Sequence, residues 1–154
     1  MSLPLPVGPP RTPPEWAAYF ALRYAVLRQP WQQPPGSERC PEDEQASTVH
    51  ALLLAPAGQA AAPEALAVGM LHPGQLDQGQ IRYMAVAASA AGSGLGSLVV
   101  QYLEQQARAT GLRELVLHSR ESAVGFYERH DYTVEAPSHL LFGVIPHFLM
   151  RKQL

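Results

Sequence analysis

The segment from residue 86 to residue 96, VAASAAGSGLG, limits the possible folds of this chain more than any other. The apolar run at residues 80–87 predicts a strand before it, and apolar residues at helical spacing predict a helix over residues 94–110. Three glycines at alternate positions join the two elements, so the backbone there carries few Cβ atoms. The amide groups of the first helical turn can then reach a ligand, at the positive end of the helix dipole. The segment therefore predicts a strand, a loop and a helix that can bind a phosphate group.

Glycine spacing alone also fits a flexible turn or another nucleotide-binding motif. A Walker A loop ends in Gly-Lys followed by Ser or Thr, whereas Gly96 is followed by Ser97 and Leu98. A dinucleotide-binding fingerprint needs an acidic residue about 20 positions further on, and Glu114 is nearly in that range. The antiparallel hairpin expected before the loop, and the short chain, argue against a dinucleotide-binding domain.

A helix is expected near the N-terminus. Thr12 can cap it, Pro13 suits its first position, and Glu15 completes a capping box. The helix is expected to reach about Leu27, because a proline follows shortly and prevents its continuation. The proline-rich residues 1–11 before it are expected to be ordered only loosely and are treated as flexible.

Apolar runs bounded by turn residues predict the strands. The second and third strands are expected to form an antiparallel hairpin, because glycine, proline and aspartate lie between them. The predicted strands cover residues 48–55, 66–71, 80–87, 112–118, 132–135 and 145–152, and a second helix covers residues 119–129. An antiparallel start followed by alternating strands and helices predicts the α/β (α+β) fold class, with a mixed sheet covered by helices.

Length and charge narrow the class of protein. The 154 residues fit one domain, residues 1–154, and the net charge is −2, with 11 basic and 13 acidic residues. A nucleic-acid partner is not expected, because such proteins carry a clustered basic face. No apolar run approaches the ~18 residues that cross a membrane, and the N-terminus lacks the basic start of a secretory signal. Cys40 stands alone, which excludes an internal disulfide and favours a cytoplasmic location.

Four segments, in order, resemble the GNAT superfamily of acyl-CoA-dependent N-acyltransferases. Residues 84–86 resemble the strand before the family's pyrophosphate loop, and residues 91–96 resemble the loop pattern Arg/Gln-x-x-Gly-x-Gly/Ala. Residues 123–127, within SAVGFYERHDY, resemble the family's Ala-x-x-x-Tyr helix. Residues 144–152 resemble a closing segment of some members, Gly-Ile-Pro-His followed by Met-x-Lys.

The resemblance implies a GNAT-like, mostly antiparallel central sheet with a β-α-β core that binds acyl-CoA. Acetyl-CoA or another acyl-CoA is then the co-substrate, and no metal is expected. The cofactor-binding residues that the resemblance implies are Met84, Ala85, Val86, Ala91, Gly92, Ser93, Gly94, Leu95, Gly96, Ser97, Arg120, Ser122, Ala123 and Tyr127.

The chain departs from the family pattern in three places. Ala91 replaces the family's Arg or Gln, so one side-chain contact near the phosphates is missing, while the backbone amides can still bind. Arg120 stands where members often carry Asn, and it is either a cofactor contact or an exposed residue at a helix start. Asp131 takes a common glycine position, and Asp tolerates a left-handed backbone better than most residues.

The resemblance implies that an amine attacks the thioester directly in a ternary complex. The amine must first lose a proton, and the developing oxygen charge needs a fixed hydrogen-bond donor. The resemblance places this donor at a backbone amide near Ala85 or Val86. It makes Tyr127 the general acid that protonates the leaving thiolate, although a tyrosine beside Phe126 can also be a core residue.

The general base is not identified by the sequence, which leaves three candidates. His118 ends a strand expected to run parallel to the one that carries Val86, so it can lie near the acyl group, although a histidine there is more often structural. Glu38 and Glu42 lie in the long loop of residues 29–47, which is expected to cover the substrate site. Either carboxylate can attract a cationic amine or relay a proton, and a solvated charge cluster is the alternative interpretation.

Other titratable residues are not assigned a catalytic role. His72 lies at a hairpin turn, expected at the far end of the sheet, and is interpreted as structural. His147 can pack or contact the substrate, and Cys40 has no evident base to activate it. The histidines and the cysteine show no metal-ligand spacing.

The sequence thus favours an N-acetyltransferase that moves an acetyl or other short acyl group to a primary amine. A non-catalytic module that binds or senses acyl-CoA is the main alternative, which Ala91 keeps open and Tyr127 argues against. A nucleotide-binding regulatory protein is a second alternative. The acceptor is a small-molecule or peptide amine, and the acidic residues of the loop mildly favour a cationic one. A homodimer is a further expectation from the family.

Overall fold

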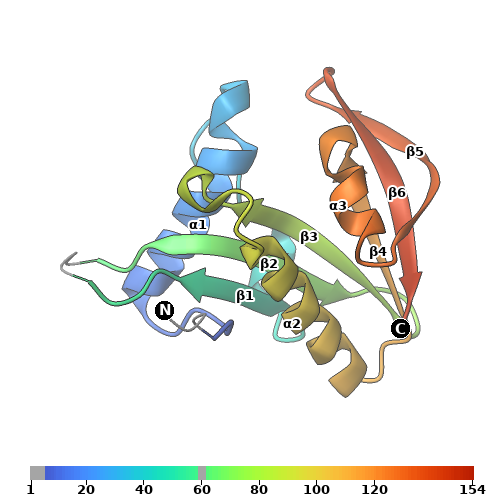
Figure 1. The fold of residues 1–154 in the computed structure, drawn as a ribbon, viewed down its shortest axis with the longest axis horizontal. Coiled ribbons are helices and arrows are strands. Elements are labelled where there is room, and N and C mark those ends of the chain that lie inside the picture. The colour runs from blue at the N-terminus through green and yellow to red at the C-terminus, as the bar shows by residue number, and fades with distance from the viewer. Residues whose placement is uncertain (1–5, 59–61) are drawn as a thin grey trace.

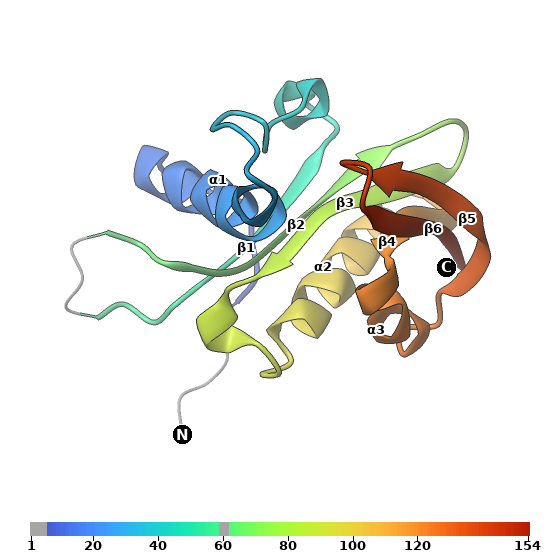
Figure 2. The ribbon, with the colours of Figure 1, turned by 90° about the horizontal axis from the view of Figure 1, so that it is seen from above.

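The computed structural model describes residues 6–58 and 62–154 of the chain. These residues form one sheet of six strands in the order β1-β2-β3-β4-β6-β5, with helices on both faces (Figures 1 and 2). The strands are β1 (Val49–Leu54), β2 (Ala65–Pro73), β3 (Gln78–Val86), β4 (Glu114–Arg120), β5 (Thr133–Leu141) and β6 (Ile145–Gln153). Only β3 and β4 run parallel, so the predicted fold class of a mixed, mostly antiparallel sheet is confirmed. The single-domain expectation stays a prediction.

Helix α1 (Pro13–Leu27) covers one face of the sheet. It begins as predicted, because the Thr12 hydroxyl accepts a hydrogen bond from the Glu15 amide at 3.3 Å. Its apolar side chains pack against β1 and β2 in a cluster that includes Tyr19, Leu52 and Val68. Two single-turn helices follow in the predicted long loop, η1 (Gln29–Trp31) and η2 (Pro41–Glu44).

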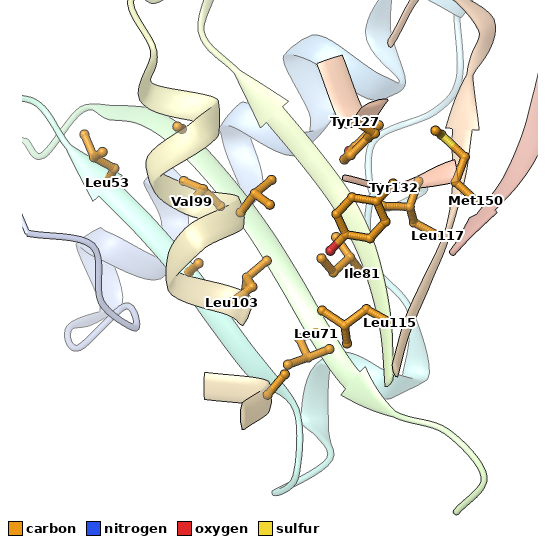
Figure 3. Close-up of a cluster of buried hydrophobic side chains, with 14 residues drawn as sticks. Leu53, Leu71, Ile81, Val99, Leu103, Leu115, Leu117, Tyr127, Tyr132 and Met150 are labelled. Carbon is orange, nitrogen blue, oxygen red and sulfur yellow. The ribbon is translucent and has the colours of Figure 1, made fainter. Parts of the chain in front are cut away.

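Helix α2 (Leu95–Ala109) covers the opposite face (Figure 2). Val99 and Leu103 are fully buried against β1, β2 and β3, in the larger core that Figure 3 shows. Gly111 has a φ of 84°, which confirms its predicted place just beyond the helix end.

The strands β3 and β4 pair only at their first residues and then separate. Residues 78–80 pair with residues 114–116, and no further pairs join the two strands in the described structure. Beyond that point β3 carries a bulge, where Tyr83 has a φ of 55° and the register with β2 shifts. The two strands diverge as a V in Figure 1, which leaves the edge of β3 after Gln80 without a neighbouring strand.

Two predicted elements have different boundaries in the structure. The helix expected at residues 119–129 is shorter, because residues 119 and 120 stay in β4, where they pair with β6. It consists of η4 (Glu121–Ala123) and α3 (Val124–Glu128). Strand β5 is longer than expected, because it pairs with β6 along most of its length, and it tolerates a proline as an edge strand.

The expectation that residues 1–11 are flexible stays a prediction. Residues 1–5 of this segment lie outside the described residues. Gly8 exchanges two backbone hydrogen bonds with Leu52, at 3.1 and 2.7 Å, so this residue is held against the outer edge of β1. No helix in the described parts of the chain is long and apolar enough to cross a membrane.

Candidate active site

The glycine loop, residues 91–96, presents amide groups that have no backbone partner. Within residues 6–58 and 62–154, no carbonyl oxygen accepts a hydrogen bond from five amides of the loop and the first turn of α2. These amides belong to Gly92, Gly94, Leu95, Gly96 and Ser97. The first amide that bonds back is that of Leu98, which donates to the Gly94 carbonyl oxygen at 3.4 Å.

The backbone of the loop needs glycine at two positions. Gly92 and Gly94 have φ values of 74° and 84°, and a Cβ atom at either position would meet no atom within 4 Å. At Gly96 a Cβ atom would lie 3.2 Å from Val86 Cγ2 and 3.4 Å from Phe126 Cζ, because α2 starts close to β3 and α3. The loop is therefore a set of N–H donors beside free space at a helix N-terminus, which fits a diphosphate.

A cavity of about 400 Å³ lies where β3 and β4 separate. One wall comes from the segments on the α1 face, with Arg28, Trp31 and Glu42. Ala123 and Tyr127 line it from the α3 side, so the cavity reaches through the gap between the strands.

Alternation along β4 decides which side chains face the α1 side of this gap. Leu115 and Leu117 are buried in the core beneath α2. Because side chains of a strand alternate between the two faces of the sheet, His118 and Arg120 lie on the face opposite to Leu115 and Leu117. Both line the cavity. The structure thus brings His118 and Arg120 into one cavity with Tyr127.

Tyr127 joins this cavity to the core. Its ring packs edge-on against Phe126 and Tyr132, with centroid distances of 5.0 and 5.8 Å, and Figure 3 shows it above the core side chains. Its hydroxyl has no hydrogen-bond partner in the described part of the chain. Burial raises the pKa of the Tyr127 phenol, and the nearby Arg120 charge opposes this shift. The phenol is therefore protonated at neutral pH and free to donate.

Three histidines from neighbouring strands stack along the cavity wall. The ring centroids of His118 and His139 lie 5.4 Å apart, and those of His139 and His147 lie 4.5 Å apart. The Nδ1–H of His147 donates to the Ile145 carbonyl oxygen at 2.9 Å, because a carbonyl can only accept, so its Nε2 carries the lone pair. Burial is the largest cause that lowers the pKa of both His118 and His147, and the hydrogen bond to Ile145 opposes it at His147.

The acidic residues of the long loop have different surroundings. Glu42 lines the cavity and its Oε2 lies 3.5 Å from Arg82 Nη1. Glu38 is buried and does not line the cavity, and its Oε1 accepts from the Gly36 amide at 3.0 Å. Glu38 is therefore not among the residues that the structure brings together in the cavity, and its role as a base stays a prediction.

A buried ion pair holds η2 in place. Arg23 is fully buried, and its Nη1 donates to both Asp43 carboxylate oxygens, at 2.8 and 3.0 Å. Its Nη2 donates to the Tyr19 hydroxyl at 2.7 Å, and that hydroxyl lies 2.8 Å from His50 Nδ1. The His50 Nε2–H donates to the Asp43 carbonyl oxygen at 3.0 Å. These contacts join η2 to α1 and β1 and fix the position of the neighbouring Glu42.

The predicted site residues fall into two groups. Those that line the cavity are Met84, His118, Arg120, Ala123, Tyr127 and Glu42. Those that do not line it are the glycine-loop residues together with Ala85, Val86, Ser122 and Glu38.

Arg28, His72 and Arg82 are among the lining residues to which the sequence assigned no site role, and His147, left open between packing and substrate contact, lines the cavity too. His72 lies at the hairpin end of β2, as expected, where it pairs with Gln80, and it also lines the cavity there. Arg82 could have been found, since it alternates with the buried Ile81 along β3.

The left-handed conformation expected at Asp131 is confirmed by its φ of 69°. The backbone between α3 and β5 therefore makes the turn that a glycine at this position would allow.

Comparisons with known proteins agree on one family. The sequence profile of the acetyltransferase (GNAT) family matches residues 16–132. The uncharacterized N-acetyltransferase YjcF of Bacillus subtilis (strain 168) is 31% identical over 74 residues, which are 48% of this chain and 53% of that protein. The curated relatives are matched over only 40 to 53% of their own length.

Solved structures share the fold over most of the chain. An acyl-CoA N-acyltransferase from Pseudomonas aeruginosa has a TM-score of 0.77 at 23% identity, with 92% of each chain covered. An aminoglycoside 6'-N-acetyltransferase, solved in complex with coenzyme A, has a TM-score of 0.74 at 16% identity, again with 92% of each chain covered. These likenesses show the fold, and the profile match over more than half of the chain shows that the protein belongs to the acetyltransferase (GNAT) family.

Proposed function

We propose that the protein transfers an acetyl or other short acyl group from acyl-CoA to a primary amine, which attacks the thioester directly in a ternary complex. The proposal depends on one observation, the unpartnered amides of the glycine loop at the start of α2, beside the gap between β3 and β4. Family membership supports it. A cytoplasmic location and a homodimer belong to the proposal as predictions.

The glycine loop binds the diphosphate of acyl-CoA in this proposal. Five amide donors and the helix dipole supply the attraction, so the missing side chain at Ala91 weakens binding without abolishing it. The thioester end then passes between β3 and β4 into the cavity. Met84, Arg120 and Ala123 line its path, and Ser122 lies in η4 between Arg120 and α3.

A backbone amide of β3 stabilises the developing oxygen charge. The Ala87 amide donates to Leu66 in β2 at 2.8 Å, and Ala85 pairs with Val68. Since amides along a strand alternate between its two edges, that of Val86 points away from β2, toward the gap. We therefore place the donor at Val86 rather than at Ala85.

Tyr127 protonates the departing thiolate. Its hydroxyl is protonated at neutral pH, lines the cavity and has no partner among the described residues, so it can donate to the sulfur. The nearby Arg120 charge favours the phenolate that forms after proton transfer.

The base that accepts the amine proton comes from the cavity wall. His118, Glu42 and His147 line the cavity, whereas Glu38 does not. The fixed tautomer of His147 aims an unprotonated nitrogen away from Ile145, and the lowered pKa of both histidines keeps them neutral at pH 7. His147 therefore joins His118 and Glu42 as a candidate base.

The experiment is release of coenzyme A thiol from acetyl-CoA over a panel of amines, with Tyr127→Phe as the matched variant. Turnover of the variant should fall by about 10²-fold or more, as for loss of a general acid. Binding of coenzyme A, measured by calorimetry, should stay tight, because the amides of the glycine loop supply most of the attraction. Tight binding with no turnover on any amine would instead indicate a module that senses acyl-CoA. Better protection by ATP or NAD than by acetyl-CoA in thermal unfolding would contradict the proposal outright.

A further inference from the structure

The cavity wall carries more positive than negative charge. Arg28, Arg82 and Arg120 line it, and Glu42 is the one acidic side chain among its described lining residues. Glu42 already lies 3.5 Å from Arg82 Nη1, so its charge is partly compensated. This excess of positive charge would repel an acceptor that carries only positive charge.

Two of these arginines have no carboxylate partner. No carboxylate oxygen of the described residues lies within ion-pair distance of Arg28 or Arg120. Arg28 donates only to the carbonyl oxygens of Ser37 and Leu27, each at 3.0 Å. Arg120 makes no hydrogen bond through its side chain in the described structure, and its guanidinium lies 5.3 Å from the Trp31 ring centroid.

The two unpaired charges are close enough to act on each other. Arg28 and Arg120 line the same cavity, where burial lowers the pKa of the Arg120 guanidinium, Tyr127 opposes this shift, and the positive charge of Arg28 adds to it. Arg28 also lies 5.5 Å from the ring centroids of Tyr83 and of Phe142, at the mouth formed by β3 and the β5–β6 hairpin. Like charges that are half removed from water favour a bound anion between them.

The diphosphate of acyl-CoA does not account for this pair. Its proposed donors lie at the start of α2, on the opposite face of the sheet from α1. Arg28 follows the last residue of α1, and Arg120 lies where the thioester end and the acceptor would meet. The anion therefore belongs to the acceptor.

We propose that the acceptor is a small amino acid, whose carboxylate binds Arg28 and Arg120 while its amine faces the thioester. This inference rests on the proposed function. The cavity of about 400 Å³ must also hold the thioester end, which leaves room for a small molecule rather than a folded protein surface. The positive wall also lowers the pKa of the incoming ammonium group, which favours its deprotonation before attack.

The experiment compares amines that differ only in the carboxylate. The pairs are L-lysine and cadaverine, L-histidine and histamine, and L-phenylalanine and phenethylamine, each with acetyl-CoA. The member with the carboxylate should have a kcat/KM about 10- to 100-fold higher, which corresponds to one charge-assisted interaction. A C-terminal lysine dipeptide added as a further arm distinguishes a free amino acid from a peptide end.

The variant Arg28→Gln should remove this preference by raising the KM for the amino acid and leaving that for the decarboxylated amine unchanged. Arg28→Lys should restore part of it. Arg108→Gln removes the same charge from the exposed surface of α2 and should leave the preference as it is.

Two kinetic outcomes overturn the inference while the proposed function stands: faster turnover of the decarboxylated amines, or a rise in the KM for acetyl-CoA rather than for the acceptor in Arg28→Gln. Binding is read independently of turnover by the unfolding temperature of the coenzyme A complex with each member of a pair. An equal shift for both members, or none, also overturns it. Failure of the proposed function is different, because coenzyme A would then give no protection, or neither member of any pair would be turned over.

Discussion

The two ends of helix α2 offer a matched pair of glycines for testing the phosphate-binding role of the loop. Gly94 precedes the helix and Gly111 follows it, and each has a φ of 84°. A Cβ atom at either position would meet no atom within 4 Å. The variants Gly94→Ala and Gly111→Ala should therefore suffer the same backbone strain and no internal clash.

The size of the two effects follows from this geometry. A left-handed backbone costs a residue with a Cβ atom about 1–2 kcal/mol, and this strain corresponds to a fall of about 2–8 °C in Tm for a domain of this size. At Gly94 the added methyl group also occupies the space in front of the free amides. Loss of one charge-assisted hydrogen bond, worth about 1.5–3 kcal/mol, should raise the Kd for coenzyme A by about 10- to 100-fold.

Thermal unfolding without ligand measures the strain, and calorimetric titration with coenzyme A measures the affinity. Both variants should lose similar stability, and only Gly94→Ala should bind more weakly. An unchanged Kd in Gly94→Ala, or an equal change in Gly111→Ala, would refute the assignment of the diphosphate to the glycine loop.

Two further predictions concern stability. Asp43→Asn leaves the fully buried Arg23 without its carboxylate and should lower the free energy of unfolding by about 3 kcal/mol or more, measured in urea. The control is Glu135→Gln, which removes an exposed pair with Arg151 and should cost less than about 1 kcal/mol. A similar loss in both variants would contradict the argument. Burial is the largest cause that lowers the pKa of His50, His72 and His147 from the ordinary value of about 6.5. Below about pH 6.5 the unfolded chain therefore binds more protons than the folded one, so the free energy of unfolding should be highest above this pH and fall below it. A Tm that stays constant from pH 7 to pH 5 would show that these histidines titrate alike in the folded and the unfolded chain.

Local signals in the sequence predicted the elements that local chemistry controls. The capping residues Thr12 and Glu15 fixed the start of α1, and Gly111 fixed the end of α2. The boundary at residues 119–129 failed because pairing between strands decided it. Ser119 and Arg120 bond to β6, which lies almost 30 residues further along the chain, and no local pattern reports that contact.

Contacts distant in sequence also decided the composition of the cavity. The glycine loop and Tyr127 could be recognised from their motifs, whereas Arg28 and His72 carry no motif of their own. Their shared position depends on the gap between β3 and β4 and on the fold of the long loop over it. The same cause explains Glu38, whose carboxylate bonds within its loop instead of facing the cavity.

The separation of β3 and β4 links the two halves of the proposed site. Pairing stops after Gln80, so the backbone groups on that edge of β3 have no strand to bond with, and buried or half-buried backbone groups need a partner. The bulge at Tyr83 keeps the strands from closing again. An extended ligand with amide groups of its own, such as the arm of acyl-CoA, can satisfy this edge while its diphosphate stays at α2. In the proposed function, the unpaired edge therefore binds the extended arm of acyl-CoA and directs the thioester to the face where the arginines and histidines of the cavity lie.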